Sequence, residues 1–304
     1  MAHEGSRRAI VAAASANLGI AVAKIVAFAI TGATSLLAEA IHSVADTGNQ
    51  GLLLLGGRRS RQAPDERHPF GHGRERYFAA FVVALVLFSV GGLFAVYEGI
   101  QKVLHPHELG SPVVAFVVLG VAIVLESLSL RTAVQETAHV RRPGQSYPTF
   151  IRSTTVPELP VVLLEDAGAL VGLALALLGT ALAEVTRQPR FDAVGSIAIG
   201  LLLIGIALVL GREMKSLLIG EAAEPEVVAA AQAALAGAPG VASVIHLRTL
   251  QLGPDDLLVA AKLELAGAPS YVETARTIDA VEVVLRAAVP SARLVFLEPD
   301  VRRP

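Results

Sequence analysis

Apolar residues along the chain gather in six long runs that are separated by polar breaks. A helix rises 1.5 Å per residue, so about 17–25 apolar residues cross the hydrocarbon core of a bilayer, which is about 30 Å thick. The pattern therefore predicts an all-α six-helix transmembrane bundle within residues 1–213. The six runs cover approximately residues 9–31, 35–57, 77–104, 112–132, 161–183 and 194–210.

A different pattern follows in residues 221–304. Pro225 suits the first turn of a helix, and Ser270 with Glu273 forms a capping-box pattern at the start of another. Two runs of alternating polarity around a turn are typical of a hairpin, and a third short run suits a last strand. The order α-β-β-α-β predicts a C-terminal cytoplasmic α+β domain of the ferredoxin-like type. The expected elements cover residues 225–236, 244–252, 257–265, 270–287 and 293–297.

Composition supports a membrane protein and limits its chemistry. Of the 304 residues, 53% are hydrophobic, and the mean hydropathy of +0.60 is too high for an ordinary soluble protein. The net charge is −2, so the chain lacks the excess of positive charge that is typical of nucleic-acid-binding proteins, and no nucleic-acid partner is expected. The chain has no cysteine, so any metal binds through His, Asp or Glu.

Arginine is concentrated in two of the polar breaks, and this predicts the orientation of the bundle. By the positive-inside rule, these breaks face the cytoplasm and both termini lie on the same side. We therefore expect a multi-pass protein of the plasma membrane that is surrounded by lipid. The arginines are Arg58, Arg59, Arg61, Arg67, Arg74 and Arg76 in the first break, and Arg141, Arg142 and Arg152 in the second.

The second apolar run carries ionisable residues at membrane depth. Glu39, His42 and Asp46 lie in it, and such groups cost about 2.5–3.5 kcal/mol each on insertion scales. His42 and Asp46 are four residues apart, so they share one face of a helix. An imidazole and a carboxylate in that relation can bind one divalent cation. The alternative interpretation is a polar contact between helices.

Two adjacent carboxylates, Glu165 and Asp166, interrupt the fifth run. They lie about 15 Å from one end of their helix, and His42 and Asp46 lie about 10–16 Å from the opposite side. Both pairs therefore fall near the middle of the bilayer, where together they offer nitrogen and oxygen ligands for a dication. We rank Asp166 above Glu165 as a ligand. Glu165 stays open as a second ligand, as a partner of a ligand or as a proton carrier.

Other charged residues also lie within or near the apolar runs. For Lys24 and Glu98 we expect side chains that snorkel toward the interface, and for Glu126 we expect burial in an ion pair.

A second candidate metal site lies in the first arginine-rich break. Asp65, His68 and His72 are spaced for a local site, and neighbouring glycines permit a tight turn. The alternative interpretation is a solvated polar loop that happens to contain histidines.

Taken together, these segments resemble the cation diffusion facilitators. The resemblance rests on the segment from Ser35 to Asp46 (SLLAEAIHSVAD) and the segment from Asp65 to Glu75 (DERHPFGHGRE), with the polar pair in the fifth run and the ferredoxin-like tail. The family consists of homodimeric, proton-coupled exporters of Zn²⁺ and related dications, which are not enzymes. The resemblance implies that metal and protons are the partners and that no prosthetic group is bound.

The resemblance also implies roles for single residues. The transport site of the family maps onto His42, Asp46 and Asp166. Its loop site maps onto Asp65 and His72, with His68 close by.

Two departures from the family pattern qualify this comparison. Many zinc-transporting members carry His four residues before the Asp of the fifth run, where this chain has Val162, and this chain instead has Glu165 next to Asp166. This arrangement resembles the branch of the animal mitochondrial zinc transporters. In the tail, Ile245, Lys262 and Leu297 stand where several bacterial members have metal-binding histidines, and His246 is the only histidine. We therefore expect a tail that dimerises without a metal cluster.

Two other functions compete with transport. An intramembrane metallohydrolase usually carries a His-Glu-x-x-His motif, which is absent from the sequence. A membrane-embedded metal sensor would bind metal without transport. Within the transporter interpretation, Zn²⁺ is favoured, and Fe²⁺, Co²⁺, Mn²⁺ and Ni²⁺ remain open because oxygen and nitrogen sites follow similar affinity orders.

Overall fold

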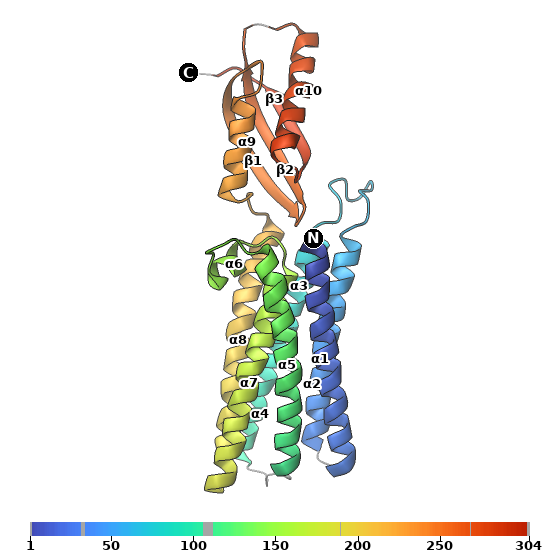
Figure 1. Cartoon of the computed structure of the whole chain (residues 1–304), viewed down its shortest axis with the longest axis vertical. Coiled ribbons are helices and arrows are strands. Elements are labelled where there is room, and N and C mark those ends of the chain that lie inside the picture. The colour runs from blue at the N-terminus through green and yellow to red at the C-terminus, as the bar shows by residue number, and fades with distance from the viewer. Residues whose placement is uncertain (1, 32–33, 106–111, 189, 268, 303–304) are drawn as a thin grey trace. The chain divides into compact units, whose positions relative to one another are not determined.

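The structure is a computed structural model that describes residues 2–31, 34–105, 112–188, 190–267 and 269–302. Side chains are described for the same residues except 2–4, 31, 34–39, 41–42 and 112. Long helices run side by side through the first two thirds of the chain (Figure 1). These elements are α1 (Ala2–Thr31), α2 (Thr34–Arg59), α3 (Glu75–Val86), η1 (Leu87–Leu93), α4 (Phe94–Leu104), α5 (Pro112–Val140), α7 (Glu158–Thr186) and α8 (Arg190–Ile219).

The predicted transmembrane bundle is confirmed by the lengths and composition of these helices. Among the described residues, five segments are long and apolar enough to cross a membrane, and α3, η1 and α4 together form one of them. The remaining long helix, α2, has 26 residues and is the least apolar of the long helices in the bundle. Its lower hydropathy follows from the polar residues in its middle, which belong to the candidate site described below.

Small side chains let the helices of the bundle approach closely. Buried alanines lie along α1, α2 and α5, where close packing between helices replaces the hydrophobic effect as the source of stability. The same principle joins α4 to α8: a Cβ atom added at Gly99 would lie 2.9 Å from the backbone nitrogen of Ile197. The buried alanines are Ala9, Ala13, Ala16, Ala40, Ala122 and Ala133.

Two helical features were not predicted from the sequence. The segment η1 is a π-helix that interrupts the third apolar run. A short helix, α6 (Tyr147–Ser153), lies between α5 and α7. The side chain of Ser146 caps α6 by accepting a hydrogen bond from the backbone of Thr149 at 3.3 Å.

The C-terminal part is a two-layer α+β fold, as predicted. Its sheet has the order β1-β2-β3, in which β1 and β2 are antiparallel and β2 and β3 are parallel. The crossover helix α10 begins with the predicted capping box of Ser270 and Glu273. The elements are α9 (Pro225–Ala236), β1 (Val241–Gly253), β2 (Asp256–Leu265), α10 (Tyr271–Ala288) and β3 (Ala292–Pro299).

Both helices of this part pack on one face of the sheet. Alternate residues of β2, such as Val259 and Leu263, are buried in a core that also contains Leu235 of α9 and Leu285 of α10. The intervening residues of β2, including Lys262, point to the other face and are half-buried. The hydrophobic pattern therefore defines one packed face and one open face.

The chain forms two compact units. One consists of Met1–Arg59 and Glu75–Lys215, and the other consists of Ser60–Arg74 and Ser216–Pro304. The loop between α2 and α3 therefore groups with the C-terminal fold. A Cβ atom added at Gly73 would lie 2.7 Å from the carbonyl oxygen of Leu252, so only glycine permits this approach of the two backbones.

Candidate metal centres

Helix α2 supplies one wall of the intramembrane site. Asp46 is half-buried on this helix, and Gln50, one turn further on, is 0% exposed. His42 lies one turn before Asp46 in the same helix, and its side chain is outside the described residues. The predicted sharing of one helix face by His42 and Asp46 therefore rests on the helical backbone.

Helix α7 supplies the other predicted pair. Glu165 is 7% exposed and Asp166 is 1% exposed, so both carboxylates are inside the bundle. Gln50 donates a hydrogen bond from Nε2 to Oε2 of Glu165 at 2.9 Å, so a side chain of α2 reaches a side chain of α7. The two predicted halves of the site are thus adjacent.

Helix α5 contributes residues whose part in this site the sequence analysis missed. Ser129 donates a hydrogen bond to Oδ2 of Asp166 at 2.6 Å, and both side chains are buried. Glu126, about one turn before Ser129, is 4% exposed. A serine and a glutamate three residues apart on a long helix were the available signal, but the apolar pattern did not reveal which helix they face.

The charges in this region are unbalanced. Repulsion from Asp46 and Asp166 acts on Glu126, and repulsion from Asp46, Asp166 and Glu126 acts on Glu165. Lys24 on α1 is the cation whose attraction acts on Glu126. Its ammonium donates a hydrogen bond to Ser43 at 3.3 Å, so it reaches a neighbouring helix where we had expected snorkelling. Four carboxylates and one lysine therefore come together inside the bundle.

The carboxylates come near one another without yet forming a closed ligand shell. Among the described residues, the only group of three His, Asp or Glu donors within 4.8 Å of one another is the loop group Asp65, His68 and His72. Two oxygen atoms in this region are buried and accept no hydrogen bond from the described part of the chain. They are the amide oxygen Oε1 of Gln50 and the carboxylate oxygen Oε1 of Glu165.

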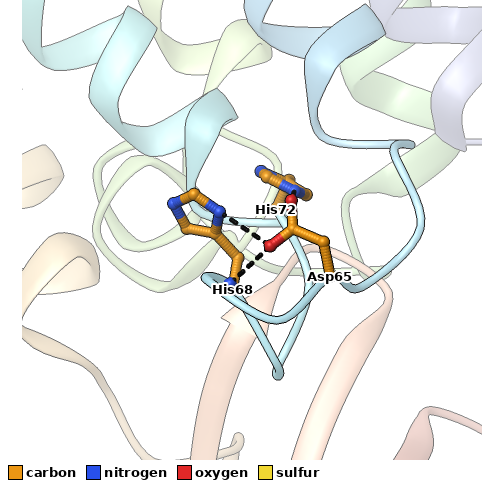
Figure 2. Close-up of side chains that lie close together, drawn as sticks. All are labelled: Asp65, His68 and His72. Carbon is orange, nitrogen blue, oxygen red and sulfur yellow. Dashed lines mark hydrogen bonds and ion pairs between the residues drawn. The ribbon is translucent and has the colours of Figure 1, made fainter.

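The loop group has the spacing of metal ligands. Figure 2 shows the carboxylate of Asp65 beside the rings of His68 and His72. Oδ1 of Asp65 lies 3.2 Å from Nδ1 of His68, and Oδ2 lies 3.4 Å from Nε2 of His72. Two ligands bound tetrahedrally at about 2.0–2.1 Å from a zinc ion lie about 3.3–3.4 Å apart. With one ligand atom of each of the three residues within 4.8 Å of the others, the group could hold a divalent cation.

A local turn holds Asp65 in its ionised form. The backbone N–H of His68 donates a hydrogen bond to Oδ1 of Asp65 at 2.6 Å. This hydrogen bond is the main reason why the pKa of Asp65 lies below its ordinary value, and the nearby His68 side chain acts in the same direction. Asp65 is therefore ready to bind a cation without first losing a proton.

The open face of the C-terminal sheet carries Lys262, one of the residues that stand where several bacterial members have a metal-binding histidine. A groove on this face is lined by residues that include His246, Lys262 and Phe296. Nζ of Lys262 lies 2.8 Å from Glu298 and 2.9 Å from Asp300, and the hydrogen bonds to Glu298 and then Asp300 raise the pKa of Lys262. Within the described part of the tail, no group of three potential metal ligands is found.

Comparison with known proteins supplies the family context. Residues 10–219 match the cation efflux transmembrane domain. The chain is 32% identical over 254 residues to the human protein "Proton-coupled zinc antiporter SLC30A9, mitochondrial", an alignment that covers 82% of this chain and 45% of the relative. It is 30% identical over 233 residues to "Metal tolerance protein C4" of Arabidopsis thaliana, covering 76% of this chain and 51% of the relative. The chain thus spans about half the length of these two relatives.

A bacterial relative matches over nearly its whole length. The chain is 28% identical over 293 residues to "Cation-efflux pump FieF" of Pectobacterium atrosepticum, and this alignment covers 96% of this chain and 92% of the relative. The similarity to this protein therefore extends through the C-terminal α+β fold as well as the helical bundle.

Proposed function

The chain belongs to the cation efflux family of multi-pass membrane transporters, and on this premise we propose that it is a proton-coupled antiporter that exports Zn²⁺ or a related divalent cation. The zinc and proton assignments are supported by the similarity to a protein named as a proton-coupled zinc antiporter. The similarity to the cation-efflux pump FieF supports export as the direction of transport.

The observation that carries this proposal is the gathering of carboxylates inside the bundle. Asp46, Glu126, Glu165 and Asp166 come from three helices, and Lys24 supplies one positive charge among them. Ionised carboxylates are costly at membrane depth unless cations neutralise them. A bundle built this way favours a state in which a divalent cation, or protons in its place, occupies the cluster.

Competition between these two kinds of cation gives the exchange mechanism. A metal ion binds only deprotonated ligands, so metal binding displaces protons and proton binding displaces metal. In this proposal, Asp46 and Asp166 are the principal ligands and His42 completes the donor set with a nitrogen. Alternation of the bundle between two open states would then carry metal in one direction and protons in the other.

The loop group is proposed to act before the transport step. Asp65, His68 and His72 lie outside the bundle helices, so they cannot carry an ion across the membrane. Their spacing fits a cation that is captured from solution, which would raise the local metal concentration. We therefore assign them an accessory metal site.

The tail is proposed to form a homodimer through the open face of its sheet. This face carries Phe296, which is 54% exposed, beside the ion pairs of Lys262. Apolar surface next to self-neutralised charge suits packing against a second copy of the chain. In this proposal, residues 1–213 are the transmembrane domain and residues 221–304 are a cytoplasmic dimerisation domain.

Orientation follows from the arginine distribution. With the arginine-rich breaks in the cytoplasm, both termini face the cytoplasm. The plasma membrane as the location is a separate part of this proposal. One relative is named as mitochondrial and another comes from a plant. Fractionation of cells that express a tagged chain is therefore the direct check of which membrane holds it. A tagged chain found in an internal membrane would overturn the plasma-membrane assignment.

Flux into sealed proteoliposomes tests the proposed function. We expect Zn²⁺ to enter vesicles that contain the chain, and we expect a pH gradient of the right sign to accelerate entry. A membrane-embedded metal sensor would bind Zn²⁺ without any flux, and that result would overturn the proposal. Parallel runs with Fe²⁺, Co²⁺, Mn²⁺ and Ni²⁺ identify the preferred metal, because oxygen and nitrogen ligands alone do not separate them.

A further inference from the structure

The amide of Gln50 is held in one orientation. Its Nε2 donates a hydrogen bond to Oε2 of Glu165 at 2.9 Å. When Glu165 is ionised, as a metal-bound state requires, the opposite orientation would put the amide oxygen against a carboxylate oxygen, and two acceptors repel each other. The amide oxygen Oε1 is therefore the atom that Gln50 keeps for another partner.

That partner is missing from the described part of the chain. Oε1 of Gln50 and Oε1 of Glu165 are both buried and accept no hydrogen bond there, although Gln50 is 0% exposed and Glu165 is 7% exposed. Leaving a buried acceptor unpaired is costly, so such atoms in a packed interior call for an explanation such as a bound water or ion. Two unpaired acceptors on one hydrogen-bonded pair suit a donor or a cation that both oxygens share.

The surroundings identify the species as a metal cation. The groups whose charges act on Glu165 are Asp46, Asp166 and Glu126, which are acceptors when ionised. The nearby ammonium of Lys24 is directed to Ser43. Carboxylate and amide oxygens together are a usual ligand set for divalent cations of the harder kind.

We propose that Gln50 is a specificity-determining residue of the cation pathway, which positions the Glu165 carboxylate with Nε2 and offers Oε1 as a neutral oxygen ligand to the transported dication. This inference rests on the proposed function and adds a ligand to it. A neutral oxygen helps a harder cation such as Mn²⁺ more than it helps Zn²⁺, which accepts imidazole readily. Gln50 should therefore broaden the range of metals that the site accepts.

The test compares four chains in sealed proteoliposomes by the KM and maximal rate of Zn²⁺ flux, and by the concentration of Mn²⁺ that halves this flux. The variants are Gln50→Leu, the exchange pair Gln50→Glu with Glu165→Gln, and the control Thr137→Val. Thr137 is equally buried, and its hydroxyl also has no hydrogen-bond partner among the described residues. It lies two turns beyond Ser129, which makes it a matched loss of one buried polar atom outside the site.

For Gln50→Leu we expect the KM for Zn²⁺ to rise by about tenfold or more, and we expect Mn²⁺ to compete less well relative to Zn²⁺. The exchange pair keeps one amide, one carboxylate and the hydrogen bond between them, so its KM should return to within about threefold of the unmodified chain. The Thr137→Val chain should keep both the KM and the effect of Mn²⁺.

Three results would overturn the inference. If Gln50→Leu lowers only the maximal rate or the melting temperature, Gln50 has a structural role. If it alters only the pH dependence, the two oxygens share a proton instead of a metal ion. Equilibrium dialysis of Zn²⁺ against the detergent-solubilised chains, each also carrying Asp65→Asn and His72→Gln to remove the loop site, measures Zn²⁺ affinity without transport. An unmodified chain without flux would remove the proposed function, whereas a Gln50→Leu chain with unchanged Zn²⁺ affinity would remove this inference alone.

Discussion

The hydroxyl of Ser129 on α5 donates a hydrogen bond of 2.6 Å to Oδ2 of Asp166 on α7. This hydrogen bond engages one oxygen of the carboxylate and fixes the orientation of the group. Partners that orient a metal ligand typically change metal affinity by about 10–100-fold when they are removed.

Ser129→Ala should therefore raise the KM for Zn²⁺ flux by about tenfold while the maximal rate changes less. Ser127→Ala is the matched control, because the Ser127 hydroxyl lies on the same helix and donates to the backbone of Ile123 at 2.6 Å. Equal kinetics for the two variants would show that Ser129 has no part in holding Asp166.

A second prediction concerns the ion pair between Arg76 on α3 and Glu158 on α7. Both side chains are 2% exposed, and the guanidinium donates to the two carboxylate oxygens at 2.5 Å and 2.6 Å. Removing one partner strands a buried charge, so Arg76→Ala should cost about 3–5 kcal/mol of stability.

Thermal unfolding in detergent measures this effect. The double variant Arg76→Met with Glu158→Leu should recover much of the loss, because it leaves no unpaired charge. If Arg76→Ala has the same melting temperature as the unmodified chain, the pair contributes little to the packing of α3 against α7.

A third prediction uses the lowered pKa of Asp65. A group whose pKa is lowered by folding contributes most to the stability of the fold when the pH is above its ordinary pKa, about 3.9 for Asp. It loses that contribution as the pH falls through the lower pKa of the folded state. Between pH 5 and 8 Asp65 therefore stays ionised, and Asp65→Asn should weaken Zn²⁺ binding at the loop by a constant factor across this window.

Binding isotherms at several pH values, in a chain that also carries Asp46→Ala and Asp166→Ala, isolate the loop. His72→Gln should instead change the slope with pH, because imidazole must lose its proton to bind metal. The double variant Asp65→Asn with His72→Gln should slow transport without abolishing it. Loss of metal binding inside the bundle in that variant would contradict the division between the two sites.

A fourth prediction concerns the tail, which offers His246 as its only histidine and has no cysteine. The mass of the full chain in detergent should be that of a dimer with chelator and with Zn²⁺ alike. A group with a raised pKa, such as Lys262, stabilises the fold when the pH is below its ordinary pKa. It loses that contribution only as the pH rises through the higher pKa of the folded state. The dimer should therefore persist unchanged from pH 6 to 9.

Lys262→Glu reverses the charge beside Glu298 and Asp300 and should shift the chain toward the monomer. A dimer that forms only with Zn²⁺ would identify the tail as a metal sensor.

The sequence predicted those features that depend on local pattern. The apolar runs, the hairpin and the capping box of Ser270 and Glu273 are all present, because periodicity and capping chemistry act over a few residues. Element ends differ by a few residues: β1 starts at Val241, ahead of the alternation, and includes register shifts that no binary pattern encodes.

Features that depend on which helices meet were not accessible in this way. The polar side chains of Gln50 and Ser129 gain their meaning from Glu165 and Asp166, which are far away in the sequence. By contrast, Ser146 before Tyr147 and Pro148 was a readable start signal for α6 that the apolar pattern overshadowed.

The most direct test of the central claim measures proton movement and Zn²⁺ movement in the same vesicles. With a pH-sensitive dye and a zinc indicator inside, the unmodified chain should admit Zn²⁺ while the interior becomes more alkaline. Asp46→Asn and Asp166→Asn should each abolish both signals and keep the melting temperature, since losing an expensive buried charge does not weaken the fold. Zn²⁺ entry without any change in internal pH, or unmodified rates in either variant, would contradict the account.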